Sequence, residues 1–162
     1  MQNQRFTETD FHIFQIPELA DRMNAIRQKI QPKFSQIGPS IAEFLTSQLD
    51  KPFYVHIAKH ARRTVHPPEQ TWVAWAANKR GYKPYPHFQF GINRHSLFIW
   101  FSIFREYQQK KVFSEYLLKH FDQIWSHLPK HYVLSEDHTK EEVVRIGDLR
   151  TDLMKEKCQR LG

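Results

Sequence analysis

Four aromatic and β-branched segments in the middle of the chain constrain its fold more than any other feature. Pro, Gly, Asn and Arg residues bound them, as is typical of strands, and they cover residues 53–57, 71–77, 87–92 and 96–104. The last two are separated by residues 93–95 alone, a link short enough for a hairpin. The pattern predicts a mostly antiparallel sheet.

Helical periodicity flanks these segments on both sides. Leu19, Met23, Ile26 and Ile30 recur at spacings of three and four and predict a helix over residues 18–30 that ends before Pro32. Similar patterns predict a helix over residues 41–49 and a strongly amphipathic one over residues 112–128, which we expect to cover the sheet.

Shorter signals complete the expected architecture. Residues 11–16 and 132–134 suit short strands, and residues 140–157 suit a polar helical tail. At 162 residues one domain is the default, so we expect a single α+β domain over residues 1–162, with a mostly antiparallel sheet packed against helices in two layers.

Cysteine use and hydropathy indicate the compartment. Cys158 is the only cysteine, so no intramolecular disulfide forms, and the N-terminal residues lack the apolar core of a signal peptide. The longest apolar run, residues 97–104, is far too short to span a bilayer as a helix. We expect a cytoplasmic protein that does not bind membranes.

The positive charge of the chain is concentrated in its middle third. The formal net charge is +7, and residues 51–95 account for all of it, because eight Lys and Arg residues there face the single acid Glu69. Five of the ten histidines lie in the same segment. A concentrated basic segment predicts an anionic partner.

Two basic loops, residues 58–70 and 78–86, flank the predicted strand 71–77 and form the candidate ligand site. Arginine suits bidentate contact with phosphate, lysine adds charge, and an aromatic face beside a cation suits stacking on unpaired bases. The predicted ligand-binding residues are Lys59, His60, Arg62, Arg63, Thr64, Trp72, Lys79, Arg80, Lys83 and His87. Because the loops start at opposite ends of one strand, they meet only if one folds back.

Three hypotheses follow from these residues. The leading hypothesis is a binding domain for a phosphate-bearing ligand. Nucleic acid is the favoured class of ligand, and a phosphate-bearing small molecule is the alternative. A second is a small phosphoester-processing enzyme with His60 or His87 as acid or base and Arg62 or Arg63 as an electrophilic clamp. The third is a protein-interaction module whose basic face meets an acidic partner.

Structural explanations stand beside each of these. The charges can form an ordinary solvated face, and most of the aromatic residues can be core, since alternation points Trp72 and Trp75 to opposite faces. No established catalytic motif is present, so catalytic residues are unassigned. No cofactor or metal is predicted: His56 and His60 are four positions apart, but in a strand and a loop rather than on one helical face, and the only carboxylate of the segment is Glu69. Cys158 suits an unreactive thiol.

The segment HIAKHARRTVHPPEQTWVAWAANKRGYKPYPHFQFGI resembles the signature block of the YktB-like family of uncharacterised bacterial proteins. FHIFQIPELADRMNAIRQKIQPKF is similar to that family's N-terminal segment, so the resemblance covers residues 9–150. It implies a compact two-layer α+β fold with an antiparallel sheet and assigns no catalytic residues.

The chain departs from the family pattern in two places. His66 stands where asparagine is expected before Pro67, and the ending KEKCQRLG differs from the family's apolar C-terminal stretch. The second difference suggests a C-terminal part that is short relative to the family. A sheet edge exposed in this way would favour pairing with a second chain, so a dimer is one expectation for an oligomeric state that the sequence leaves open.

Overall fold

The four predicted central strands form one antiparallel sheet. The computed structural model describes residues 5–137 and 142–162. Its strands run in the order β1-β2-β3-β4, and each pairs antiparallel with its neighbour. Their bounds are β1 Tyr54–Ile57, β2 Gln70–Ala76, β3 His87–Asn93 and β4 Leu97–Ser102. The prediction of an antiparallel sheet with a hairpin between the last two strands is confirmed.

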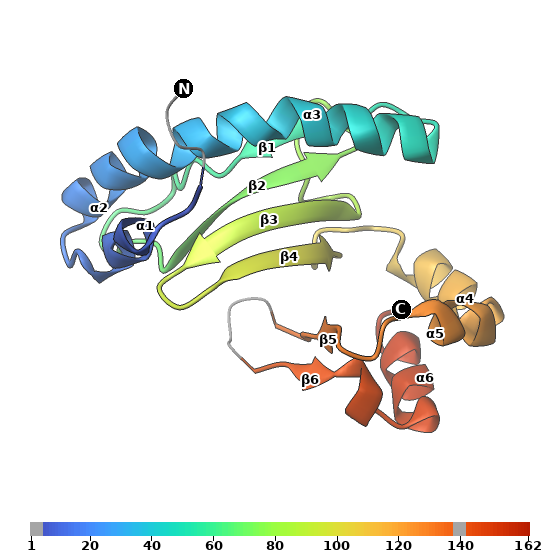
Figure 1. The fold of residues 1–162 in the computed structure, drawn as a ribbon. Coiled ribbons are helices and arrows are strands. Elements are labelled where there is room, and N and C mark those ends of the chain that lie inside the picture. The colour runs from blue at the N-terminus through green and yellow to red at the C-terminus, as the bar shows by residue number, and fades with distance from the viewer. Residues whose placement is uncertain (1–4, 138–141) are drawn as a thin grey trace. The chain divides into compact units, whose positions relative to one another are not determined.

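The long helix α3, Gln31–Leu49, covers one face of this sheet, along β1 and β2 (Figure 1). The indole N–H of Trp75 in β2 donates to the carbonyl of Gly38 in α3 over 2.9 Å. A Cβ added at Gly38 would lie 2.8 Å from Cγ1 of Val55 in β1, so the helix approaches the strand closely only because this residue is glycine. Helix and sheet thus form the two predicted layers.

The core lies between α3 and the sheet. It consists of fully or nearly fully buried apolar residues from the helices and from the helix-facing side of the strands. Its members are Ile13, Phe14, Met23, Ile26, Ile30, Phe34, Phe53, Val73, Trp75 and Ile92. The alternation along β2 is as predicted, with Val73 and Trp75 on this face and Trp72 on the other.

The helical segment before the sheet does not end at Pro32, and this part of the prediction is wrong. α2, Leu19–Ala25, continues through a π-helical turn, Ile26–Ile30, into α3, which also contains the predicted helix 41–49. Proline lacks an N–H and its ring crowds the preceding turn, and the wider π turn accommodates both effects just before Pro32. Pro39 also lies inside α3.

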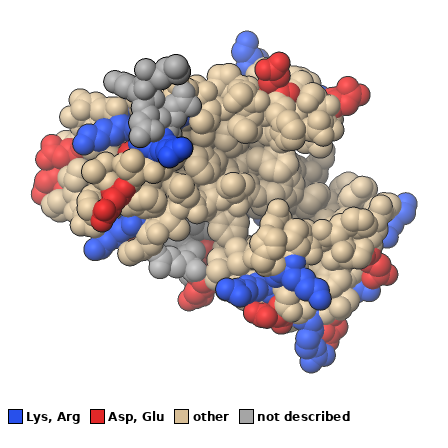
Figure 2. Space-filling view, in the orientation of Figure 1, with Lys and Arg blue, Asp and Glu red and all other residues tan. Residues whose placement is uncertain are grey.

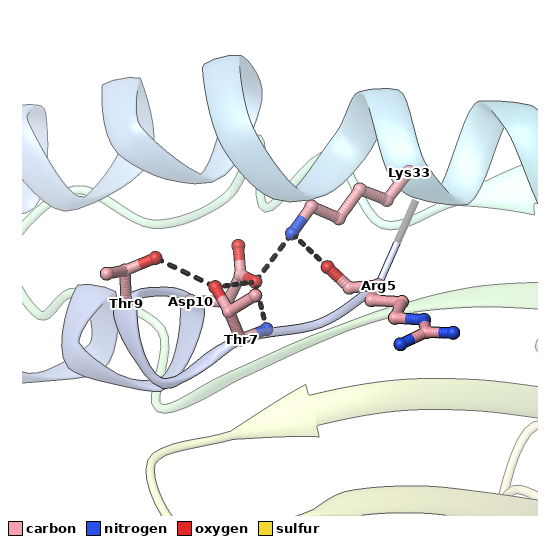
Figure 3. Close-up of polar contacts among 5 residues, drawn as sticks. All are labelled: Arg5, Thr7, Thr9, Asp10 and Lys33. Carbon is pink, nitrogen blue, oxygen red and sulfur yellow. Dashed lines mark hydrogen bonds and ion pairs between the residues drawn. The ribbon is translucent and has the colours of Figure 1, made fainter. Parts of the chain in front are cut away.

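The predicted strand at residues 11–16 is helical instead. α1, Glu8–His12, is followed by a 3₁₀ turn, Ile13–Gln15. The Asp10 carboxylate accepts the Thr7 N–H over 2.7 Å and the Thr7 hydroxyl over 3.2 Å, which caps the first turn (Figure 3). Because the start of the helix is capped, this segment forms a helix, although its run of apolar residues also suits a strand.

Asp10 also binds the N-terminal segment to α3. The Lys33 ammonium lies 2.5 Å from Asp10 Oδ2 and donates to the carbonyl of Arg5 over 2.9 Å (Figure 3). The Asp10 side chain is 3% exposed and that of Lys33 is 18% exposed, so the carboxylate of this ion pair is buried and the ammonium is partly buried. Lys33 lies over the ring of Phe6 as well, which packs against Phe34 and Phe90 of the core.

The contacts divide the chain into two units, Met1–Tyr107 and Gln108–Gly162. The second contains α4 Lys110–Lys119, α5 Phe121–His127, α6 Thr151–Gln159, and a two-stranded antiparallel sheet of β5 Val133–Leu134 and β6 Val144–Arg145. The predicted helix 112–128 is therefore two helices, interrupted at His120, whose backbone is not helical. Its coverage of the sheet stays a prediction.

The C-terminal tail is only partly as expected. α6 confirms a helix there, whereas residues 144–148 form β6 and a 3₁₀ turn, and residues 140 and 141 of the predicted helix lie outside the described part. Cys158 of α6 is buried, which raises the pKa of its thiol. Within residues 5–137 and 142–162, no helix has the length and apolar character needed to cross a membrane.

Candidate anion-binding site

The first basic loop, between β1 and β2, is held to the helices near both of its ends. Gln31 Nε2 donates to the carbonyl of Ala58 over 3.1 Å, and Nη1 of the buried Arg22 donates to the carbonyl of Pro68 over 3.0 Å. Arg22 also donates to the carbonyl of Ile16 over 2.7 Å. These anchors fix the loop while leaving most of its side chains in solvent.

The second basic loop, between β2 and β3, folds back along β2. It leaves the strand at its C-terminal end, yet the hydroxyl of Tyr82 accepts the indole N–H of Trp72, near the strand's start, over 3.1 Å. His56 Nε2 donates to the carbonyl of Asn78 over 2.9 Å, and the Asn78 side-chain oxygen accepts the backbone N–H of Arg80 over 2.8 Å. The condition for the two loops to meet is therefore fulfilled.

His60 occupies the point where the loops meet. Its Nε2 lies 3.0 Å from the Thr71 hydroxyl, and its ring meets the indole of Trp72 edge-on, with centroids 5.4 Å apart. Its φ is +51°, in the left-handed region that few residues other than glycine adopt. Contacts on both sides of the imidazole hold this strained backbone in place, as often occurs at functional sites.

The electrostatic environment of His60 shows that charge from both loops reaches it. Burial, the largest cause, and the charges of Arg63 from the first loop and Lys83 from the second together lower its pKa to about 4. The imidazole is therefore neutral at pH 7. Two cations that are far apart in sequence act on one group, so the positive field of the two loops converges there.

The cations of the middle segment form no ion pairs, although the charge of Glu106 reaches the Tyr82 hydroxyl and adds to the effect of burial in raising its pKa. Among the residues that the structure describes, none of the eight Lys and Arg residues of positions 51–95 forms an ion pair. Burial lowers the pKa of Arg22, and the charge of Glu69, the segment's one acid, partly offsets this, so Glu69 lies near Arg22. Elsewhere, basic and acidic side chains lie beside one another, as over α1 and α2 in Figure 2.

Apart from His87, the predicted ligand-binding residues divide into two groups. In the first group, which consists of His60, Arg63, Trp72 and Lys83, the ring of His60 contacts Trp72 and the charges of Arg63 and Lys83 act on His60. Lys59, Arg62, Thr64, Lys79 and Arg80 are exposed on the same two loops, without a described contact that draws their side chains into this group. The first group is the candidate site, and we call it the His60 cluster.

His87 lies in the interior. It is 0% exposed, its Nδ1 donates to the carbonyl of Tyr85 over 2.7 Å, and its Nε2 accepts the Gln89 amide N–H over 2.9 Å. Its ring packs edge-on against Tyr82 and Phe104. A buried, hydrogen-bonded imidazole of this kind positions the Tyr82 ring and reaches no solvent.

The predicted set omits two residues of the site, Thr71, whose hydroxyl lies against His60, and Tyr82. Tyr82 links Trp72, His56 and His87 through one hydrogen bond and two ring contacts. Burial raises the pKa of its hydroxyl, which therefore stays protonated at neutral pH. The signal for Tyr82 in the sequence was an aromatic residue interleaved with the cations of a basic loop.

Comparison with known proteins places the chain in a family. A model described as a domain of unknown function, DUF1054, matches residues 6–162. The chain belongs to this family. The match agrees with the resemblance to a family of uncharacterised bacterial proteins that the central and N-terminal segments showed.

Relatives at high identity support this membership. A UPF0637 protein of Staphylococcus carnosus is 45% identical over 160 residues, which cover 99% of the chain and 78% of the relative. A UPF0637 protein of Oceanobacillus iheyensis is 49% identical over 144 residues, covering 89% and 70%, and one of Bacillus mycoides is 42% identical over 159, covering 98% and 76%. The family is bacterial, and these relatives are longer than the chain.

Proposed function

We propose that the chain is a binding domain for an anionic, phosphate-bearing ligand, with nucleic acid the class best suited to the site. The observation that carries the proposal is the return of the second loop to the start of β2, where Tyr82 accepts the Trp72 indole N–H and His60 packs on Trp72. The charges of Arg63 and Lys83, from the two loops, both act on His60 there. Concentrated positive charge without paired acids attracts anions, and arginine beside lysine suits phosphate oxygens. Such a domain would act in the cytoplasm.

The neutral state of His60 supports a role for the cluster in binding a ligand rather than a role for His60 in pairing with an acid. A cluster of two cations and a protonated imidazole would repel itself, whereas a neutral imidazole leaves the net charge of the cluster to Arg63 and Lys83. An anion bound between Arg63 and Lys83 would be attracted by both of their charges. The imidazole, the Tyr82 hydroxyl and the half-buried Trp72 then add polar and stacking contacts beside that anion.

The test is fluorescence anisotropy of labelled oligonucleotides, at low and at physiological salt, with the wild type and an Arg63→Ala/Lys83→Ala variant. We expect salt-dependent binding, and in the variant a logarithmic salt slope that is smaller by about one to two units. The charge-matched control is Arg27→Ala/Lys29→Ala, which removes two exposed cations of the π-helical turn.

A second readout reports on the site itself. Bound inorganic phosphate would offset the charges of Arg63 and Lys83, so the NMR-detected pKa of His60 is expected to rise from about 4 when phosphate is added. Oligonucleotide binding that is equal in the site variant and the control, together with a His60 pKa unmoved by phosphate, would overturn the proposal.

A further inference from the structure

The face of the sheet opposite α3 carries a row of aromatic side chains. The strand register places Trp72 of β2, Gly91 of β3 and Phe98 of β4 side by side on this face, with Trp100 two positions further along β4. Trp72, Phe98 and Trp100 are all half-buried, so part of each ring is open to contact. Three partly open aromatic rings on one sheet face are what base stacking requires.

Gly91 makes this row continuous. A Cβ built at Gly91 would lie 2.1 Å from Cζ of Phe98, so the phenyl ring lies directly over the glycine. Because neighbouring strands are about 4.8 Å apart, Trp72 and Phe98 would otherwise be separated by about 10 Å. The Phe98 ring spans part of this gap, and its centroid lies 6.4 Å from that of Trp100.

The His60 cluster borders one end of this row. His60 meets Trp72 edge-on, and the Trp72 indole is held in place by its hydrogen bond to Tyr82. Cations therefore lie where the row begins, and aromatic rings extend from there across β2 to β4. Phosphates at the cluster would leave the attached bases free to lie on the rings.

We propose that Trp72, Phe98 and Trp100 form a stacking platform for the unpaired bases of single-stranded nucleic acid, whose phosphates lie at the His60 cluster. The inference rests on the proposed function and deepens it, because it assigns the bases a site as well as the phosphates. Bases of a duplex are already stacked on one another and do not reach such rings. The platform selects single strands over duplexes without requiring a particular sequence.

The test uses anisotropy with three probes of equal length: an oligothymidylate, the same backbone with abasic sites, and a duplex. The variant is Phe98→Leu, which still fills the space over Gly91 but removes the aromatic face. We expect about a tenfold loss of affinity for oligothymidylate, because stacking on one ring contributes about that much, with little change for the abasic strand. The control is Phe101→Leu, an exposed residue on the opposite face of the same strand.

The outcomes separate the two proposals. If the abasic strand or the duplex binds as tightly as oligothymidylate, or if Phe98→Leu binds as the wild type does, the platform is wrong while the phosphate site stands. If none of the three probes binds even at low salt, the platform is wrong, and the proposed function fails as well if added phosphate leaves the pKa of His60 unmoved. A thermal melt of Phe98→Leu that matches the melt of Phe101→Leu shows that an affinity loss is not a folding defect.

Discussion

The Trp72 indole donates to the Tyr82 hydroxyl across ten positions of sequence, and this bond returns the second basic loop to the start of β2. Replacing Tyr82 with Phe leaves the ring contacts with His56 and His87 possible but removes the acceptor of the indole N–H. We expect a loss of about 1 kcal/mol in the free energy of unfolding, as for a typical hydrogen bond. Urea denaturation measures it.

The control for this prediction is Tyr85→Phe in the same loop. The Tyr85 hydroxyl accepts the Asn78 amide N–H in an exposed position, so water replaces that bond and the loss should be smaller. Equal losses in the two variants would contradict a special role for Tyr82. Amide hydrogen exchange should also become faster across residues 78–86 in Tyr82→Phe, because the loop is then less firmly held.

The strands were predictable because a two-residue period, aromatic and β-branched composition and turn residues agree along residues 53–104. The errors in the predicted helices and strands came where two local sequence signals favoured different structures. The TETD capping pattern that ends at Asp10 marks the start of a helix, but the apolar run after it suggested a strand. Pro32 is accommodated by a π turn that no sequence pattern predicts.

The candidate site was predictable as a location and a charge, because the segregation of Lys and Arg is visible in the sequence. Its geometry was not, because it depends on contacts between residues far apart in the chain, such as Tyr82 with Trp72. Likewise, His87 appeared equivalent to His60 in sequence, yet the strand register buries one and the loop leaves the other half-buried.

Protonation of His60 should make stability depend on pH in a definite direction. Burial and then Arg63 and Lys83 hold its folded pKa at about 4, below the unfolded value of about 6.5. Between these values the unfolded chain binds a proton that the folded chain does not, so stability falls as pH decreases from about 6.5 to about 4. The slope from one group is at most about 1.4 kcal/mol per pH unit, and smaller for this half-buried ring.

Chemical denaturation of wild type and His60→Gln across this pH range isolates the contribution of the imidazole. The difference in unfolding free energy between the two should change between pH 6.5 and pH 4 and be constant above pH 7. His66→Gln, in an exposed position of the same loop, serves as the control for replacing a histidine of this loop. A difference that does not vary with pH would show that His60 titrates normally.

The ion pair of Asp10 and Lys33, whose carboxylate is buried, should matter more to stability than any surface ion pair of the chain. Lys33→Met leaves the Asp10 carboxylate 3% exposed and without its cation, and we expect a loss of about 3 kcal/mol in the free energy of unfolding. Thermal or urea unfolding measures it. Lys29→Met, an exposed position one turn earlier, should change stability by less than about 0.5 kcal/mol.

An Asp10→Asn variant separates charge from hydrogen bonding at this pair. An asparagine oxygen still accepts the Thr7 N–H, so this change removes the charge and keeps the cap. Lys33→Met combined with Asp10→Asn should therefore be more stable than Lys33→Met alone, because no unpaired charge is left buried. Strictly additive losses would contradict the pairing.

Gly91 and Phe98 should be strongly coupled, because a Cβ at Gly91 would lie 2.1 Å from Phe98 Cζ. Gly91→Ala forces the phenyl ring away, and we expect a loss of about 1–3 kcal/mol in the free energy of unfolding, as for other overpacked positions. In a Phe98→Ala background the same change meets open space and should cost much less. A double-mutant cycle from urea denaturation gives the coupling, expected to exceed about 1 kcal/mol. A coupling near zero would mean that the ring does not rest on Gly91, and the aromatic row would then be interrupted at β3.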